Sequence, residues 1–126
     1  MSKKRILVID DEEDFCFFIK QNLEKNGGFA VTYTTDPDKG IRIAQKELPD
    51  LILLDIIMPK KTGIKVLEVL KQDKKTMLIP IIMLTAVEDN QTKLKASHYY
   101  SEDYIVKPVT YALLKAKIDE VLSRCR

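Results

Sequence analysis

The sequence has only two cysteines and one histidine, and this scarcity excludes several kinds of site. Cys16 and Cys125 are far apart, and neither lies in a Cys-x-x-Cys or Cys/His metal spacing. With His98 as the only histidine, a zinc site, a histidine-based triad and a disulfide framework are all disfavoured. We therefore expect Cys16 to be a small buried hydrophobic residue.

The chain also lacks a long hydrophobic segment and a strong charge of one sign. The apolar run at residues 6–9 is too short for the core of a signal peptide. The longest apolar stretch, residues 77–87, is interrupted by Pro80 and reaches about half a membrane span. The net charge of +2 gives no bulk attraction to nucleic acid or membrane. We expect a cytoplasmic protein with no direct nucleic-acid partner and no membrane partner.

What the chain does have is the composition of one globular domain. It has 126 residues, of which 45% are hydrophobic and 32% are charged. A chain of this size can bury a core without disulfides or metals. We find no internal repeat, low-complexity tract or linker, and we expect a single domain over residues 1–126 with its core at about 4–123.

Short apolar runs alternate with helical patterns along the chain. Three runs are apolar on both faces, as in central strands of a parallel sheet. The predicted strands are residues 6–9, 51–54 and 81–84, with weaker candidates at 29–33 and 104–106.

The intervening segments carry helix start and stop signals. Asp36-Pro37, Thr62-Gly63 and Thr110 predict three helix starts, and Asn26-Gly27-Gly28 predicts the end of the first helix. A more polar helix is expected over about 88–99. Helical spacing predicts two buried faces: Phe15, Phe18, Ile19 and Leu23 on the first helix, and Leu113, Leu114, Ile118, Val121 and Leu122 on the last.

Five strand–helix repeats predict an α/β fold, with a parallel sheet covered by helices on both faces. In open sheets of this kind, ligands bind beyond the carboxyl ends of the strands. The residues at these ends are Asp10 and Asp11, then Asp55, Thr85 and Lys107. The sequence thus predicts three carboxylates, a hydroxyl and an ammonium at one edge of the sheet.

This residue set suits phosphoryl transfer. Crowded carboxylates repel one another, and a hard cation with oxygen ligands, such as Mg²⁺, relieves that repulsion. Asp55 follows a wholly apolar strand, where a carboxylate can act as a nucleophile towards a phosphoryl group. Mg²⁺, Lys107 and Thr85 can each meet one oxygen of the transferred group.

The same residues carry a resemblance along nearly the whole chain. The matching stretches are residues 8–12, 54–59 with Gly63, 84–86 and 103–108. In this order and at these separations, the sequence resembles the receiver domain of two-component response regulators. The resemblance implies a flavodoxin-like sheet with strand order 2-1-3-4-5.

The resemblance further implies that Asp55 is phosphorylated by a sensor histidine kinase or a histidine phosphotransfer protein. Asp10, Asp11, Asp55 and the backbone carbonyl of Ile57 would hold Mg²⁺. The chain would assist its own phosphorylation and dephosphorylation without being an enzyme on a separate substrate. The Lys107–Pro108 bond would be cis.

Thr85 and Lys107 would sense the phosphoryl group, and Tyr104 would be the switch aromatic. As Thr85 moves towards the phosphoryl group, Tyr104 turns inward. That movement reshapes the face of the fourth helix, the fifth strand and the fifth helix, where an unknown downstream protein docks.

Two departures from the family pattern concern that face and the hydrolysis rate. Tyr100 and Ser101 stand where the family commonly has Gly-Ala, so we expect an altered connection before the fifth strand. Tyr99, Tyr100 and Tyr111 are candidates either for a protein interface or for packing under the loop.

Ile57 and Val87 are both apolar. In the family, these two positions flank the path of the water that attacks the aspartyl phosphate. We expect slow hydrolysis, with simple packing of both residues as the alternative.

Three other functions compete with a phosphorylated receiver. A haloacid-dehalogenase-like hydrolase usually has a second Asp where Ile57 stands, and a flavodoxin-like phosphate loop would not be acidic as residues 10–14 are. A docking-only receiver usually lacks a site residue, and none is lost here. The chain stops four residues after Leu122, which predicts a stand-alone receiver, with a piece of a larger regulator as the alternative.

Overall fold

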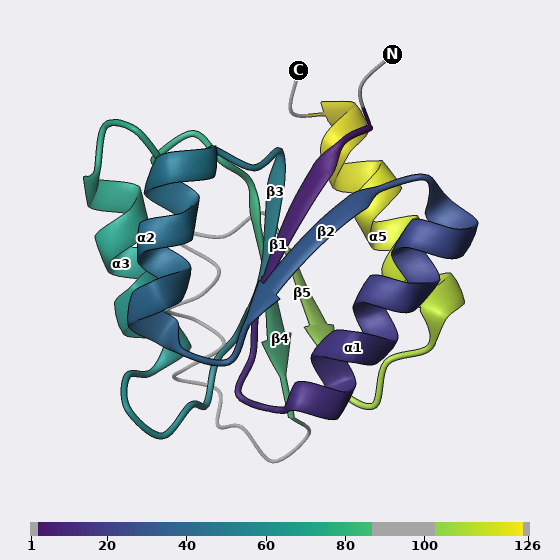
Figure 1. The fold of residues 1–126 in the computed structure, drawn as a ribbon, viewed down its shortest axis with the longest axis horizontal. Coiled ribbons are helices and arrows are strands. Elements are labelled where there is room, and N and C mark those ends of the chain that lie inside the picture. Colours follow the sequence, from purple (N-terminus) through teal and green to yellow (C-terminus); the bar gives the residue numbers. More distant parts are fainter. Residues whose placement is uncertain (1–2, 87–102, 125–126) are drawn as a thin grey trace.

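A computed structural model gives the fold and describes residues 3–86 and 103–124 (Figure 1). Within these ranges the strands form one five-stranded parallel sheet with the order β2-β1-β3-β4-β5. The predicted doubly wound α/β fold and its strand order are therefore confirmed. The strands are β1 (Arg5–Ile9), β2 (Ala30–Thr34), β3 (Leu51–Asp55), β4 (Ile81–Thr85) and β5 (Asp103–Val106).

Helices cover both faces of the sheet. Figure 1 shows α1 and α5 on one side and α2 and α3 on the other. The helix predicted over about 88–99 lies outside the described residues. The helices are α1 (Glu13–Asn22), which continues into the π-helical turn η1 (Leu23–Gly27), then α2 (Pro37–Glu47), α3 (Gly63–Gln72) and α5 (Tyr111–Arg124).

Alternate residues of each central strand pack into two separate hydrophobic cores, one on each face of the sheet. On β1, Ile6 and Val8 pack with the residues of α1 and α5, whereas Leu7 and Ile9 pack with those of α2 and α3. A strand buried on both faces needs apolar residues at every position, because successive side chains point to opposite faces. This explains why the three central strands are continuous apolar runs.

The predicted helix ends are present. Asp36 accepts a hydrogen bond from the backbone N–H of Asp38, and Pro37 is the first residue of α2. Thr62 caps α3, and Thr110 accepts from the N–H of Leu113 at the start of α5. Gly28 follows η1 with a left-handed φ of 74°, which glycine adopts without strain. Local capping chemistry therefore fixes where these helices begin and where the first one ends.

Two predicted core residues lie at the surface instead. Phe18 is 40% exposed and Leu113 is 45% exposed. The buried stripe of α1 is narrower than its apolar face, because Cys16, Ile19 and Leu23 already fill the contact with the sheet. On α5, Leu113 is rotated about 100° from Leu114 and falls on the flank of the helix. The prediction for Cys16 is confirmed, since it is fully buried.

Across residues 3–86 and 103–124, the structure contains no helix that is long and apolar enough to cross a membrane.

Candidate functional site

The candidate site lies where the parallel strands end. Asp10 follows β1, Asp55 is the last residue of β3, Thr85 is the last of β4 and Lys107 follows β5. Asp10, Asp55 and Thr85 are buried, although all three are polar. The Lys107–Pro108 peptide bond is cis, as the resemblance implies. The topology therefore gathers the residues that the sequence singled out.

Asp10, Asp11 and Asp55 form a compact carboxylate cluster. One oxygen of each lies within 4.8 Å of the others. Burial, followed by the negative charge of Asp10, raises the pKa of Asp55 to about 8. Burial also raises the pKa of Asp10, although the backbone N–H of Glu12 and the ammonium of Lys107 oppose the shift. A divalent cation would relieve this repulsion, and the all-oxygen donor set fits Mg²⁺.

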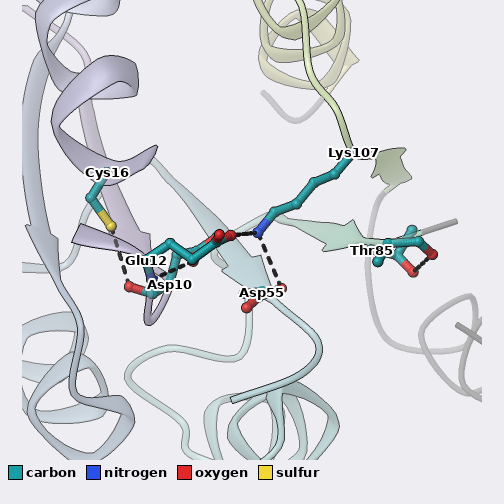
Figure 2. A network of polar contacts seen from close by, with 7 residues as sticks. Asp10, Glu12, Cys16, Asp55, Thr85 and Lys107 are labelled. Atoms are coloured by element: carbon teal, nitrogen blue, oxygen red, sulfur yellow. Dashed lines mark hydrogen bonds and ion pairs between the residues drawn. The ribbon is translucent and has the colours of Figure 1, made fainter. Parts of the chain in front are cut away.

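Lys107 provides positive charge beside the cluster (Figure 2). Its Nζ lies 2.9 Å from Oδ2 of Asp10, 2.8 Å from Oε1 of Glu12 and 3.7 Å from Oδ1 of Asp55. Burial alone would lower the pKa of Lys107, but the hydrogen bonds to Glu12 and Asp10 and the charge of Asp55 raise it above its ordinary value. The ammonium is therefore a fixed positive charge at neutral pH.

Thr85 lies at the same edge of the sheet, but its hydroxyl is hydrogen-bonded to the backbone rather than to the carboxylate cluster. Its hydroxyl donates to the backbone carbonyl of Ala86 at 3.3 Å. Figure 2 shows it apart from the group formed by Asp10, Asp55 and Lys107. Contact between Thr85 and a group bound to Asp55 would thus require a rotation of this hydroxyl.

Tyr104 and Tyr111 occupy different environments. Tyr104 is half-buried in β5, beside Met83 of β4, and packs against the core under α2 and α3. Tyr111 packs against the opposite core, which supports the packing alternative for this residue. Tyr99, Tyr100 and Ser101 lie outside the described residues.

Ile57 is exposed rather than packed into the core. Its exposed fraction is 47%, and it follows Asp55 by two positions. Ile57 is therefore not part of the buried core, and its effect on hydrolysis stays a prediction. Val87 lies outside the described residues.

Sequence reasoning missed three contacts around the site. Glu12 was given no role in the site, yet it pairs with Lys107. The ring of Phe15 lies under the same ammonium, with Nζ 4.5 Å from the ring centroid. The thiol of Cys16 donates to the backbone carbonyl of Asp10 at 3.3 Å. The position of Glu12 directly after Asp10-Asp11, at the edge that also holds Lys107, was the available signal for the first contact.

A groove of ≈ 620 Å³ opens beside Lys107, between α1 and the segment that leads into α5. Phe18, which is exposed, forms part of its wall. The lining residues are Glu12, Asp14, Phe15, Phe18, Ala86, Lys107, Pro108 and Val109.

The chain matches a known protein family over most of its length. The family model described as "Response regulator receiver domain" matches residues 6–119. The chain is 36% identical over 121 residues to the alkaline phosphatase synthesis transcriptional regulatory protein PhoP of Bacillus subtilis (strain 168), covering 96% of this chain and 49% of that protein. It is 35% identical over 125 residues to the phosphate regulon transcriptional regulatory protein PhoB of Escherichia coli (strain K12), covering 96% and 52%. The chain spans about half the length of these curated relatives.

Solved structures show the same fold. The response regulator receiver domain protein (CheY-like) from Methanospirillum hungatei JF-1 superposes with a TM-score of 0.91 and 30% sequence identity. The superposition covers 98% of this chain and 97% of that one. The likeness therefore extends over nearly the whole chain.

Proposed function

Because the chain belongs to the family of response regulator receiver domains, we propose that Asp55 accepts a phosphoryl group from a phosphohistidine. The donor would be a sensor histidine kinase or a histidine phosphotransfer protein. We place a single receiver domain on the chain, with its core at about 4–123. The observation that carries the proposal is the buried Asp55 beside Asp10, Asp11 and Lys107.

The proposed reaction is a direct transfer to the carboxylate of Asp55. One carboxylate oxygen forms a bond to phosphorus while the bond between phosphorus and the donor nitrogen breaks. The electron pair stays on the histidine ring, which leaves as neutral imidazole when it carries one proton. The product is an aspartyl phosphate. Lys107, whose Nζ lies 3.7 Å from Oδ1 of Asp55, is placed to balance negative charge on the transferred oxygens.

Asp10, Asp11 and Asp55 are the side chains that would hold Mg²⁺, together with the backbone carbonyl of Ile57. The clustering of these three carboxylates supports this assignment, since a cation would offset the repulsion between them, which adds to burial in raising the pKa of Asp55. When bound, Mg²⁺ would supply positive charge towards the phosphoryl oxygens. Lys107 adds a second positive charge from the side of β5.

Phosphorylation would then be read out through Thr85 and Tyr104. The hydroxyl of Thr85 now donates to Ala86 and would turn to a phosphoryl oxygen. Tyr104, which is half-buried against the core under α2 and α3, would turn further inward in response. The face that includes β5 and α5 would change shape and receive the downstream protein.

The test is the intact mass of the protein after incubation with a small acyl phosphate and Mg²⁺. A single phosphoryl adduct that needs Mg²⁺ and is absent from Asp55→Asn would support the proposal. If folded protein with demonstrated Mg²⁺ binding forms no adduct, the next donor is a phosphorylated histidine phosphotransfer protein. Failure with both donors would overturn the proposal in favour of a docking-only receiver.

A further inference from the structure

Among the described residues, three carboxylates pair with Lys107, and Glu12 is the exposed one. Its side chain is 63% exposed, whereas those of Asp10 and Asp55 are almost fully buried. The distance from Glu12 Oε1 to Lys107 Nζ is 2.8 Å, the shortest of the three contacts to this ammonium. The outermost carboxylate therefore holds the cation at least as closely as the buried ones do.

The side chain of Glu12 does not cap α1 through a hydrogen bond, although the residue occupies the N-cap position. Its backbone N–H instead donates to Oδ1 of Asp10 at 2.9 Å, which fixes the residue beside the cluster. Asp10 thus orients Glu12 through the backbone, and both residues bind Lys107.

An ammonium has three N–H donors. Glu12 and Asp10 take two of them at hydrogen-bond distance, while Asp55 is farther away at 3.7 Å. A phosphoryl group on Asp55 would need a donor from the same ammonium. The third N–H is left for such a group, whose negative charge would repel the carboxylate of Glu12 and draw the ammonium away from it.

We propose that Glu12 is a positioning residue that restrains Lys107 and slows phosphorylation of Asp55. This inference rests on the proposed function of Asp55. Glu12 draws the ammonium outward and must release it, or share it, when the phosphoryl group arrives. Because Glu12 faces solvent, it can swing away without disturbing the buried carboxylates. An exposed ion pair is weak, so its removal corresponds to about a two- to fivefold rate increase.

The experiment compares phosphorylation rates of the full chain with a small acyl phosphate at saturating Mg²⁺. Glu12→Gln keeps the size of the side chain and removes its charge. Glu12→Asp keeps the charge but shortens the reach to Lys107. Asp14→Asn is the control: it removes a negative charge from the wall of the same groove and leaves every residue of the proposed site unchanged. We expect both Glu12 variants to react about two- to fivefold faster than the parent and Asp14→Asn to react at the parental rate.

The outcomes distinguish a restraint of Lys107 by Glu12 from a general effect of negative charge and from no effect of Glu12. The phosphorylation rate could instead rise equally in Glu12→Gln and Asp14→Asn and stay parental in Glu12→Asp. That result would show that only the total negative charge near Asp55 matters, and it would overturn the proposal. Parental or slower rates in both Glu12 variants would overturn it as well. In either case a Mg²⁺-dependent adduct on the parent Asp55 would leave the proposed function standing. If the parent forms no adduct with either donor, the proposed function fails and the restraint fails with it.

Discussion

Gly63, the first residue of α3, lies against the backbone carbonyl of Asp55. A Cβ at this position would be 2.0 Å from that oxygen and 2.8 Å from the carbonyl carbon. The N–H of Gly63 also donates to the carbonyl of Ile56. The end of β3 and the start of α3 can approach this closely only because the residue has no side chain.

Gly63→Ala should therefore damage both stability and the metal site. We expect a loss of about 1–3 kcal/mol in the free energy of unfolding, because backbone atoms must shift to admit the methyl group. The same shift moves Asp55, so Mg²⁺ affinity should fall. Urea unfolding and a Mg²⁺ titration measure the two effects. Gly28→Ala is the control: it places alanine at a left-handed φ in open space, so it should cost stability and leave Mg²⁺ affinity unchanged.

The pKa of Asp55 predicts how stability depends on pH without metal. The pKa is 3.8 in its ordinary state and about 8 in the folded protein, so the folded state holds a proton that the unfolded chain releases between these values. Stability should therefore be greatest at the acidic end of this window and fall as pH rises towards 8, by up to about 1 kcal/mol per unit.

Asp55→Asn should remove most of this slope between pH 5 and 8 and exceed the parent in stability at pH 8. Urea unfolding at several pH values in the presence of a chelator measures it. A parent whose stability is flat or rises over this range would contradict the raised pKa of Asp55.

Mg²⁺ should stabilise the folded protein at pH 8, since it binds the cluster that folding creates. Asp10→Asn should weaken Mg²⁺ binding about tenfold or more, whereas Asp14→Asn should bind as the parent does. The effect of Mg²⁺ should shrink towards pH 5, where Asp55 is protonated. Thermal unfolding against Mg²⁺ concentration measures all three. Equal stabilisation of Asp10→Asn and the parent would place the ion elsewhere.

Tyr111 offers a prediction far from the carboxylates. Its hydroxyl is buried and has no hydrogen-bond partner among the residues that the structure describes. Tyr111→Phe should leave stability unchanged or raise it by about 1 kcal/mol, because it removes an unsatisfied polar group. Tyr33→Phe is the comparison, since the hydroxyl of Tyr33 is hydrogen-bonded to Glu13 and its loss should not stabilise. Destabilisation by Tyr111→Phe, seen in urea unfolding, would show that the hydroxyl has a partner.

The sequence predicts the site well where topology alone decides the outcome. Asp10, Asp55 and Lys107 come together because parallel strands end at one edge, whatever the side-chain details. Phe18 and Leu113 were misplaced because periodicity gives the direction of a helix face but not its width.

Other features depend on single torsion angles. Glu12 was missed because the reach of a long side chain depends on rotamers that no pattern encodes. Leu48, the residue after α2, adopts a left-handed φ of 48° that glycine or asparagine would ordinarily fill. Arg5 donates to its carbonyl and secures this turn from a distant part of the chain.

The reactivity of the buried Cys16 thiol depends on local unfolding beside the site. Burial, followed by the charge of Asp10, raises the pKa of the thiol to about 12, so the thiol stays protonated at neutral pH. Because this side chain is also fully buried, an alkylating reagent should reach Cys16 only after the contact between α1 and β1 has come apart. The rate at which Cys16 is alkylated would then measure local unfolding next to the carboxylate cluster, with a residue that the chain already contains.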